Sequence, residues 1–252
     1  MTIAHDVAGD GYPVVLVHST VCDRRMWDPQ VPALSDAGHL VVRCDLRGYG
    51  ETPAPDRPYD NARDVLDLLD LLAVEKVALV GSSGGGRVAL ELAARWPHRV
   101  RALALLCTAL AGHEPSDELR SFGEREDALL EAGDIDRATD LNVTTWLGPY
   151  ADDATRAKVR QMQRHAFEVQ LAATEEQPPI RVDTDPARIT ATSLVVSGAH
   201  DMSDFRTIAT YLAGTVPAAR HVELDWAGHL PSLERPDVVN TLLTDFLSAP
   251  GE

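Results

Sequence analysis

Residues 76–96, KVALVGSSGGGRVALELAARW, decide the fold of this chain. Residues 77–80 form an unbroken apolar run, which is typical of a strand buried on both faces of a parallel sheet. Beyond the glycine-rich segment, Val88, Leu92 and Trp96 recur every four residues, which predicts a helix with one apolar face. The stretch therefore predicts a strand, a tight turn and a helix, in that order.

The turn has the sequence Gly-Ser-Ser-Gly-Gly, which matches the pattern G-x-S-x-G. Between a strand and a helix this pattern is typical of a nucleophile elbow, a sharp turn that exposes a serine. The positions two before and two after the nucleophile must be nearly free of side chain, and glycine meets that need at the least steric cost. For Ser83 these positions are Gly81 and Gly85, whereas for Ser82 one of them is Val80. Ser83 is therefore the predicted nucleophile.

The same glycines have other interpretations. Their spacing matches a phosphate-binding loop, but Arg87 and Val88 stand where Lys and Ser or Thr are required, so this is excluded. Residues 84–89 fit the dinucleotide pattern G-x-G-x-x-A, but the next apolar run ends in Cys107 and not in an acidic residue for the ribose hydroxyls. A glycine-rich turn with an incidental serine remains open on this motif alone.

Composition limits the class of protein. A chain of 252 residues is long enough for one α/β domain with an insertion. With 23 basic and 39 acidic residues, its net charge of −16 disfavours nucleic acid and anionic membrane surfaces as partners. The three cysteines are far apart, which argues against a disulfide framework and a zinc site. We see no signal peptide and no apolar run that could span a bilayer, so we expect a cytoplasmic protein.

Apolar runs and helix-period segments alternate along the rest of the chain. One of the predicted helices covers residues 26–37 and ends at Gly38. Regular alternation implies a mostly parallel central sheet with helices on both faces. Besides a short N-terminal strand within residues 2–8, the predicted strands are residues 14–17, 40–44, 77–80, 102–106, 193–197 and 220–224.

The alternation stops between residues 113 and 185, where the sequence is charged and has helical periodicity. We expect residues 1–112 and 186–252 to form one core and residues 113–185 to form a helical cap, or lid, over the strand ends. A helical excursion away from the site is the alternative. Trp146 is the cap residue that we expect to contact substrate.

Three polar side chains follow the carboxyl ends of predicted parallel strands: Ser83, Asp201 and His229. In open α/β sheets the ligand crevice lies at those strand ends. The order Ser, Asp, His is the chain order of an α/β-hydrolase triad.

Together these motifs resemble the α/β-hydrolase superfamily, specifically its capped esterases, lactonases and carbon–carbon hydrolases. The resemblance covers nearly the whole chain. It rests on His18 after its apolar strand, D-x-R-G-x-G at residues 45–50, the elbow, G-x-x-D at residues 198–201 and the terminal Gly-His pair that ends at His229. It implies the α/β-hydrolase fold with a helical cap insertion.

The family mechanism assigns roles to these residues. Ser83 attacks the substrate carbonyl, His229 takes its proton, and Asp201 holds the imidazole in the right tautomer. Two backbone N–H groups form the oxyanion hole; the elbow assigns one to Gly84, and the resemblance assigns the other to Thr20, with Val21 as the alternative. The usual His-Gly of the family is His-Ser here, which puts the second donor in question.

Nearby polar residues are expected to be structural. His18 is interpreted as a buried histidine that shapes its loop, and Asp204 as the N-cap of a helix. Asp45 and Arg47 are expected to tie loops together. Glu234 is interpreted, with its neighbour Arg235, as a charge on the first turn of a helix.

The predicted function is that of a serine hydrolase that acts on an ester, lactone or other activated carbonyl of a small organic molecule. Val21 and Trp146 are the candidates for substrate contacts. No metal or cofactor is predicted. The alternatives are a carbon–carbon bond hydrolase and a non-hydrolytic protein of the same fold, such as a lyase or a ligand receptor. The oligomeric state and the natural substrate are not predicted.

Overall fold

A seven-stranded sheet forms the centre of the molecule, with strand order β1-β3-β2-β4-β5-β6-β7. The computed structural model describes residues 2–173, 177–180 and 182–248. The strands are β1 (His5–Ala8), β2 (Tyr12–Val17), β3 (His39–Cys44), β4 (Val77–Ser82), β5 (Val100–Leu106), β6 (Thr192–Gly198) and β7 (Ala219–Leu224).

All neighbouring strands run parallel except β1, which pairs antiparallel with β3. Parallel strands end at the same edge of a sheet, so the loops after β2, β4, β5, β6 and β7 meet there. The prediction of a mostly parallel sheet with helices on both faces is confirmed.

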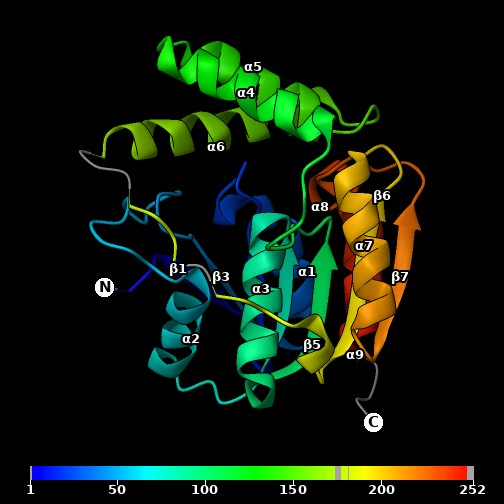
Figure 1. Cartoon of the computed structure of the whole chain (residues 1–252). Helices are drawn as coiled ribbons and strands as arrows, with labels where there is room; N and C mark the ends of the chain where they lie inside the picture. The colour runs from blue at the N-terminus through cyan, green and yellow to red at the C-terminus, as the bar shows by residue number, and fades with distance from the viewer. Residues whose placement is uncertain (1, 174–176, 181, 249–252) are drawn as a thin grey trace.

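Helices cover both faces of this sheet (Figure 1). On one face α2 (Asn61–Leu71), α3 (Gly84–Arg95) and α7 (Ser203–Thr215) pack on the sheet through one apolar cluster. On the other face α1 (Gln30–Asp36) and α9 (Pro236–Ser248) pack through a second cluster. The strands are buried between the two clusters, which explains their unbroken apolar runs.

One predicted helix is divided in two. In place of a helix over residues 26–37, the chain forms the short 3-10 helix η1 (Arg24–Trp27) and then α1. Pro29 lies between them and lacks the backbone N–H that a continuous helix would need. The interruption turns the loop after β2, where Met26 and Trp27 are buried.

Between β5 and β6 the chain forms three helices beyond the carboxyl ends of the strands (Figure 1). They are α4 (Asp117–Glu131), α5 (Ile135–Trp146) and α6 (Asp153–Leu171). We call residues 113–185 the insertion; of these, residues 174–176 and 181 lie outside the described residues, as do residues 1 and 249–252 of the predicted core. A 3-10 helix, η3 (Pro186–Arg188), leads back into β6.

The start of the insertion is bonded to the core through Asp204, and the prediction that this residue caps a helix is wrong. The N-cap position of α7 is occupied by Met202. The buried carboxylate of Asp204 instead accepts hydrogen bonds from the backbone N and Oγ of Ser116, at 2.8 and 2.6 Å, and from Nε2 of His113 at 2.9 Å. Asp204 therefore ties α7 to the N-cap of α4.

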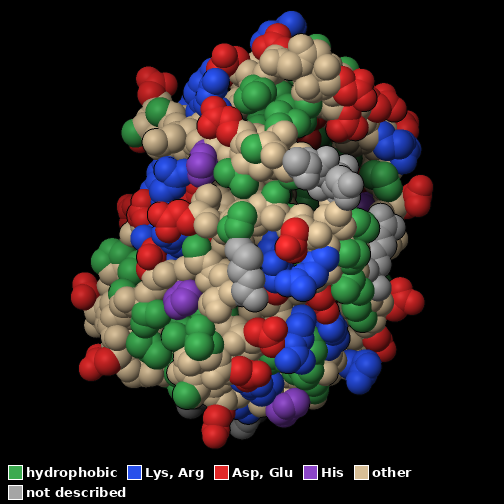
Figure 2. Space-filling view, turned by 90° about the vertical axis from the view of Figure 1, so that its left-hand side faces the viewer, with side chains coloured by type: hydrophobic (Ala, Val, Ile, Leu, Met, Phe, Trp, Pro, Cys, Tyr) green, Lys and Arg blue, Asp and Glu red, His purple; other side chains and the backbone are tan. Residues whose placement is uncertain are grey.

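The surface shown in Figure 2 carries Lys and Arg side chains beside Asp and Glu side chains, with no continuous basic surface on that face. Many of the charges are paired, as in the contacts of Arg63 with Asp67 and of Arg206 with Glu223. None of the helices in the described part of the chain combines the length and the apolar character needed to cross a membrane.

Candidate active site

Ser83 occupies a strained turn between β4 and α3. Its backbone lies at φ 53° and ψ −118°, a conformation that a residue with a side chain rarely adopts. Its N–H donates to Leu106 O at 2.9 Å, and its carbonyl accepts from Arg87 N at 3.1 Å and Ala109 N at 3.0 Å. These bonds hold the strained turn against the end of β5.

The glycines beside Ser83 lie where side chains cannot fit. A Cβ atom on Gly81 would lie 2.5 Å from Gly85 O, and one on Gly85 would overlap His18 O. Ser82 is the last residue of β4 and is fully buried, whereas Ser83 is 6% exposed. The packing that the sequence predicts around Ser83 is therefore present.

His229 and Asp201 form a buried acid–base pair. Nδ1 of His229 lies 2.8 Å from Oδ2 of Asp201, and the two side chains are 2% and 1% exposed. Oδ1 of Asp201 accepts from Met202 N at 2.8 Å, which fixes the carboxylate. Because Nδ1 of His229 faces Asp201, Nε2 on the opposite edge of the ring points away from that carboxylate.

Aromatic side chains hold the His229 ring. The Phe205 ring at the start of α7 lies 4.2 Å away between centroids, and the Trp146 ring at the end of α5 lies 4.6 Å away. The indole Nε1 of Trp146 donates to Asn142 Oδ1 at 2.9 Å, and its ring also packs edge-on against Phe122. The His229 ring is therefore held from the core and from the insertion.

Comparison with known proteins agrees with this geometry. A model described as "Alpha/beta hydrolase family" matches residues 14–242. The chain is an α/β-hydrolase. It is 33% identical to a protein of Variovorax paradoxus (strain S110) named "Putative carbamate hydrolase RutD", over 100% of this chain and 99% of the relative.

Two solved structures are also similar to this hydrolase. The enol-lactonase from Burkholderia xenovorans LB400 is 29% identical, with a TM-score of 0.81 over 98% of this chain and 96% of its own. A thermophilic esterase from Thermogutta terrifontis is 27% identical, with a TM-score of 0.79 over 97% of this chain and 92% of its own. The resemblance seen in the sequence is confirmed at the level of family and fold.

The loop after β2 brings Thr20 beside the elbow. A Cβ atom on Gly84 would lie 2.5 Å from Thr20 Cγ2, so these two residues are neighbours. The backbone N–H of Val21 donates to Ser19 Oγ at 3.5 Å. This engagement of Val21 favours Thr20 as the candidate for the second oxyanion donor.

His18 shapes that loop, as predicted. Its Nδ1 donates to Ser19 O at 2.8 Å, and its Nε2 accepts from Leu46 N at 2.9 Å, an arrangement that needs a neutral ring. Burial lowers the pKa of His18, which agrees with this assignment. Asp45 and Arg47 also have the predicted structural roles, since Asp45 accepts from Arg24 N at 2.7 Å and Arg47 pairs with Asp64 at 2.6 Å.

Cys107 lies beside the acid–base pair, and the three side chains raise the question of a metal site. Ligand atoms of Cys107, Asp201 and His229 lie within 4.8 Å of one another, the one such group among the described residues. Burial and the Asp201 charge raise the pKa of the Cys107 thiol well above its usual range. Cys107 Sγ donates to Gly228 O at 3.6 Å, and His229 Nδ1 and Asp201 Oδ2 bond each other, so each of the three side chains already has a hydrogen-bond partner. These donors fit a hydrogen-bonded pair better than a metal.

Glu234 is the site residue that sequence reasoning misses. As expected, Glu234 lies in the first turn of a helix, the single-turn helix α8 (Pro231–Glu234), but it is only 9% exposed, and its hydrogen bonds to the histidine loop are not predicted by the sequence. Its carboxylate accepts from Gly228 N at 3.0 and 3.1 Å and from Leu230 N at 3.2 Å. Pro231 in the sequence indicates a helix start, but no local pattern indicates that this carboxylate bonds the histidine loop.

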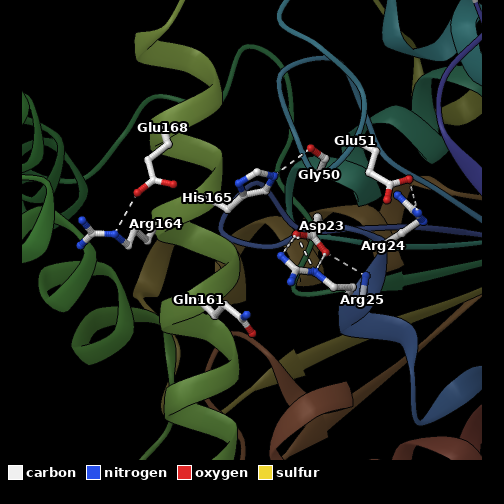
Figure 3. Close-up of a pocket in the computed structure, with 9 residues that line it drawn as sticks. All are labelled: Asp23, Arg24, Arg25, Gly50, Glu51, Gln161, Arg164, His165 and Glu168. Carbon is white, nitrogen blue, oxygen red and sulfur yellow. Dashed lines mark hydrogen bonds and ion pairs between the residues drawn. The ribbon is translucent and has the colours of Figure 1, made fainter.

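A polar pocket of about 430 Å³ lies between α6 and the loops of the core (Figure 3). The pocket contains none of the triad candidates, and its arginines are largely paired, as Arg25 is with Asp23 at 2.6 Å. His165 Nε2 of α6 bonds Gly50 O at 3.0 Å across it. The pocket thus marks where α6 rests on the core. It is lined by Asp23, Arg24, Arg25, Gly50, Glu51, Gln161, Arg164, His165 and Glu168.

Proposed function

We propose that this protein is a serine hydrolase that cleaves an ester, lactone or related activated carbonyl of a small organic molecule. Ser83 is the nucleophile, His229 the general base and Asp201 the triad acid. The observations that carry the proposal are the buried 2.8 Å contact of His229 with Asp201 and the strained elbow that holds Ser83 between β4 and α3.

A serine hydroxyl is a weak nucleophile at neutral pH and needs a base that accepts its proton as it attacks. With Nδ1 of His229 engaged by Asp201, Nε2 is the atom that takes the proton from Ser83 and later delivers it to the leaving group. The buried Asp201 carboxylate stabilises the imidazolium formed in between. Attack gives a tetrahedral intermediate, loss of the leaving group gives an acyl-enzyme, and water then releases the acid.

The negative oxygen of the tetrahedral intermediate needs preorganised donors. The N–H of Gly84 opens helix α3, where the helix dipole also favours negative charge. Thr20 N–H is proposed as the second donor, because Thr20 packs on Gly84 and Val21 N–H already bonds Ser19. In serine proteases, removal of one such donor costs about 10²–10³ in kcat.

The names of the relatives include a carbamate hydrolase, an enol-lactonase and an esterase. Their substrate classes share a carbonyl carbon bonded to a heteroatom that can leave, which is the group that this triad attacks. We propose that the insertion is a cap that selects among them. Trp146, which lies on His229, is its proposed substrate contact, and Val21, beside Thr20, is the proposed contact from the core.

Turnover of a panel of nitrophenyl esters, lactones and carbamates tests this proposal. Ser83→Ala should abolish hydrolysis, and an organophosphonate probe should label Ser83 stoichiometrically. Ser82→Ala is the matched control, because Ser82 Oγ is buried without a hydrogen-bond partner in the described residues, and its loss should leave turnover nearly unchanged. A phosphonate adduct on Ser82, or full activity of Ser83→Ala, would overturn the assignment.

A lyase or ligand receptor on the same fold would bind its ligand without hydrolysing any member of that panel. A carbon–carbon hydrolase would use the same residues but would need a substrate with a ketone beside the cleaved bond. A diketone in the panel therefore separates that chemistry from ester cleavage.

A further inference from the structure

We propose that Glu234 is a positioning residue that couples the catalytic base to the insertion, so that His229 is correctly placed only when α5 is seated on the core. This inference rests on the proposed function of His229. It adds a residue outside the triad and a dependence of catalysis on the position of the insertion.

The Glu234 carboxylate holds the loop on both sides of His229. Gly228 N, directly before the histidine, donates to both carboxylate oxygens, and Leu230 N, directly after it, donates to Oε1 at 3.2 Å. A single side chain thus fixes the peptide group between residues 227 and 228 and the one between residues 229 and 230. The orientation of the His229 ring depends on these peptides.

The same carboxylate reaches the insertion. The backbone N–H of Gly148, two residues beyond α5, faces the Glu234 carboxylate and counters the rise that burial causes in its pKa. A Cβ atom on Gly148 would overlap Glu234 Oε2 and lie 2.6 Å from Gly228 N, so the two chain segments touch. In addition, His229 N donates to Trp146 O at 3.0 Å. The end of α5 is therefore hydrogen-bonded to His229 and packed against the side chain that holds the His229 loop.

We call the contacts of Glu234 with the His229 loop and with Gly148 the joint. All the backbone groups that face the Glu234 side chain there are N–H donors, so this side chain must offer only hydrogen-bond acceptors. A carboxylate offers four lone-pair positions and no donor, which suits the N–H groups of Gly228, Leu230 and Gly148. Burial raises the pKa of Glu234, while these N–H groups act against the rise. The titratable and charged groups that face this region are His229, Asp201 and the Cys107 thiol, together with Arg156 of α6, which donates to Gly148 O at 3.2 Å.

Access to the nucleophile explains why such a joint matters. Ser83 and His229 are 6% and 2% exposed, and the Trp146 ring lies on the imidazole. The proposed coupling therefore includes a movement of the end of α5 that admits substrate to Ser83. Because that end is bonded to the His229 loop, the movement that admits substrate also displaces the base, and reseating of α5 restores it.

Two variants break the joint from opposite sides. In Glu234→Gln, the amide oxygen can still accept from Gly228 and Leu230, but the NH₂ group faces the Gly148 N–H, so the link to the insertion is lost while the loop is retained. In Gly148→Ala, the new methyl group collides with Glu234 and Gly228. Gly123→Ala is the control in the insertion, because a Cβ atom there meets nothing within 4 Å.

We expect kcat to fall about 10-fold or more in Glu234→Gln and Gly148→Ala, with a much smaller change in KM, and to stay unchanged in Gly123→Ala. The acid limb of kcat/KM should also move to lower pH in Glu234→Gln, because loss of a negative charge disfavours the imidazolium. Circular dichroism and melting curves establish that each variant is folded. A structural role alone would lower the melting temperature without moving the acid limb.

The two proposals fail in different ways. If Ser83→Ala retains activity, the serine mechanism fails, whatever the joint variants do. If Ser83→Ala is inactive while Glu234→Gln and Gly148→Ala both keep kcat and the acid limb of the wild type, the triad stands and the coupling is overturned. Should one of the joint variants fail to fold, the other still decides.

Discussion

The imidazole of His229 contacts both Asp201 and Trp146. Nδ1 of His229 lies 2.8 Å from Oδ2 of Asp201, and the centroid of the imidazole lies 4.6 Å from the centroid of the Trp146 indole ring. The first contact comes from the core, at the end of β6, and the second from the insertion. A histidine held by a carboxylate on one edge and by an aromatic face is restricted in both tautomer and rotation. Loss of either contact should therefore change catalysis.

Asp201→Asn should fold normally and lose activity by about 10²-fold or more, because an amide does not enforce the histidine tautomer that accepts the serine proton. In serine proteases the equivalent change lowers kcat by about 10⁴. Measurement of kcat on a nitrophenyl ester checks this. The exposed Asp225, converted to Asn, is the control and should retain wild-type kcat. An active Asp201→Asn would assign the acid elsewhere.

The pH dependence of kcat/KM should show a fall on the acid side. Only the neutral form of the His229 imidazole accepts the proton of Ser83. Activity should therefore be lost as acid protonates the ring. Rates between pH 5 and 9 with one ester test this, with melting curves at each pH to show that the fold is intact. A flat profile down to pH 5 would exclude a histidine base.

Asp204 should contribute to stability and not to chemistry. It is 3% exposed and bonds Ser116 and His113, so Asp204→Ala should lower the free energy of unfolding by about 1–3 kcal/mol. Asp204→Asn should cost less, because the amide oxygen still accepts from Ser116 N. Urea unfolding measures both. Loss of kcat in a folded Asp204→Asn would make this residue the triad acid.

The carboxylate of Asp204 should also make the free energy of unfolding depend on pH. Burial alone would raise the pKa of Asp204, but hydrogen bonds from Ser116 and His113 outweigh it and the pKa is lowered. The pKa of Asp204 is thus lower in the folded protein than in the unfolded chain, where an aspartate has a pKa of about 3.9. The stabilisation is therefore complete above about pH 3.9 and is lost as the pH falls through the pKa of the folded state. The difference in stability between wild type and Asp204→Ala should therefore shrink below about pH 4. A constant difference down to pH 2 would contradict the assignment.

The sequence predicts what local pattern controls. Apolar runs predict the positions of the strands. The steric needs of a tight turn favour Ser83 over Ser82 as the nucleophile, and the close packing around the flanking glycines of Ser83 in the structure agrees with this choice. What the sequence does not predict is which partner a side chain bonds after the chain folds. Asp204 and Glu234 lie near helix starts, but a carboxylate there has the same local pattern whether it caps the helix or bonds a distant segment, and the predicted N-cap role of Asp204 is wrong. Burial of Glu234 against Gly148 joins residues 86 positions apart, since 234 − 148 = 86, and no local pattern shows this.

The last prediction separates the catalytic contact of Trp146 from its packing. Trp146→Ala removes a ring that lies on His229 and on Phe122, so both the melting temperature and the kinetics should change; truncation of a buried aromatic residue costs about 3–5 kcal/mol. Phe122→Ala is the matched control, because Phe122 packs on Trp146 from within the insertion. Both variants should melt at lower temperature, but Trp146→Ala should alter KM and the preference among esters, lactones and carbamates far more than Phe122→Ala does. Steady-state kinetics on the substrate panel, at a temperature where both variants are folded, makes the comparison. If the two variants show the same substrate profile as wild type and differ from it in stability alone, Trp146 is a packing residue and substrate selection lies elsewhere in the insertion.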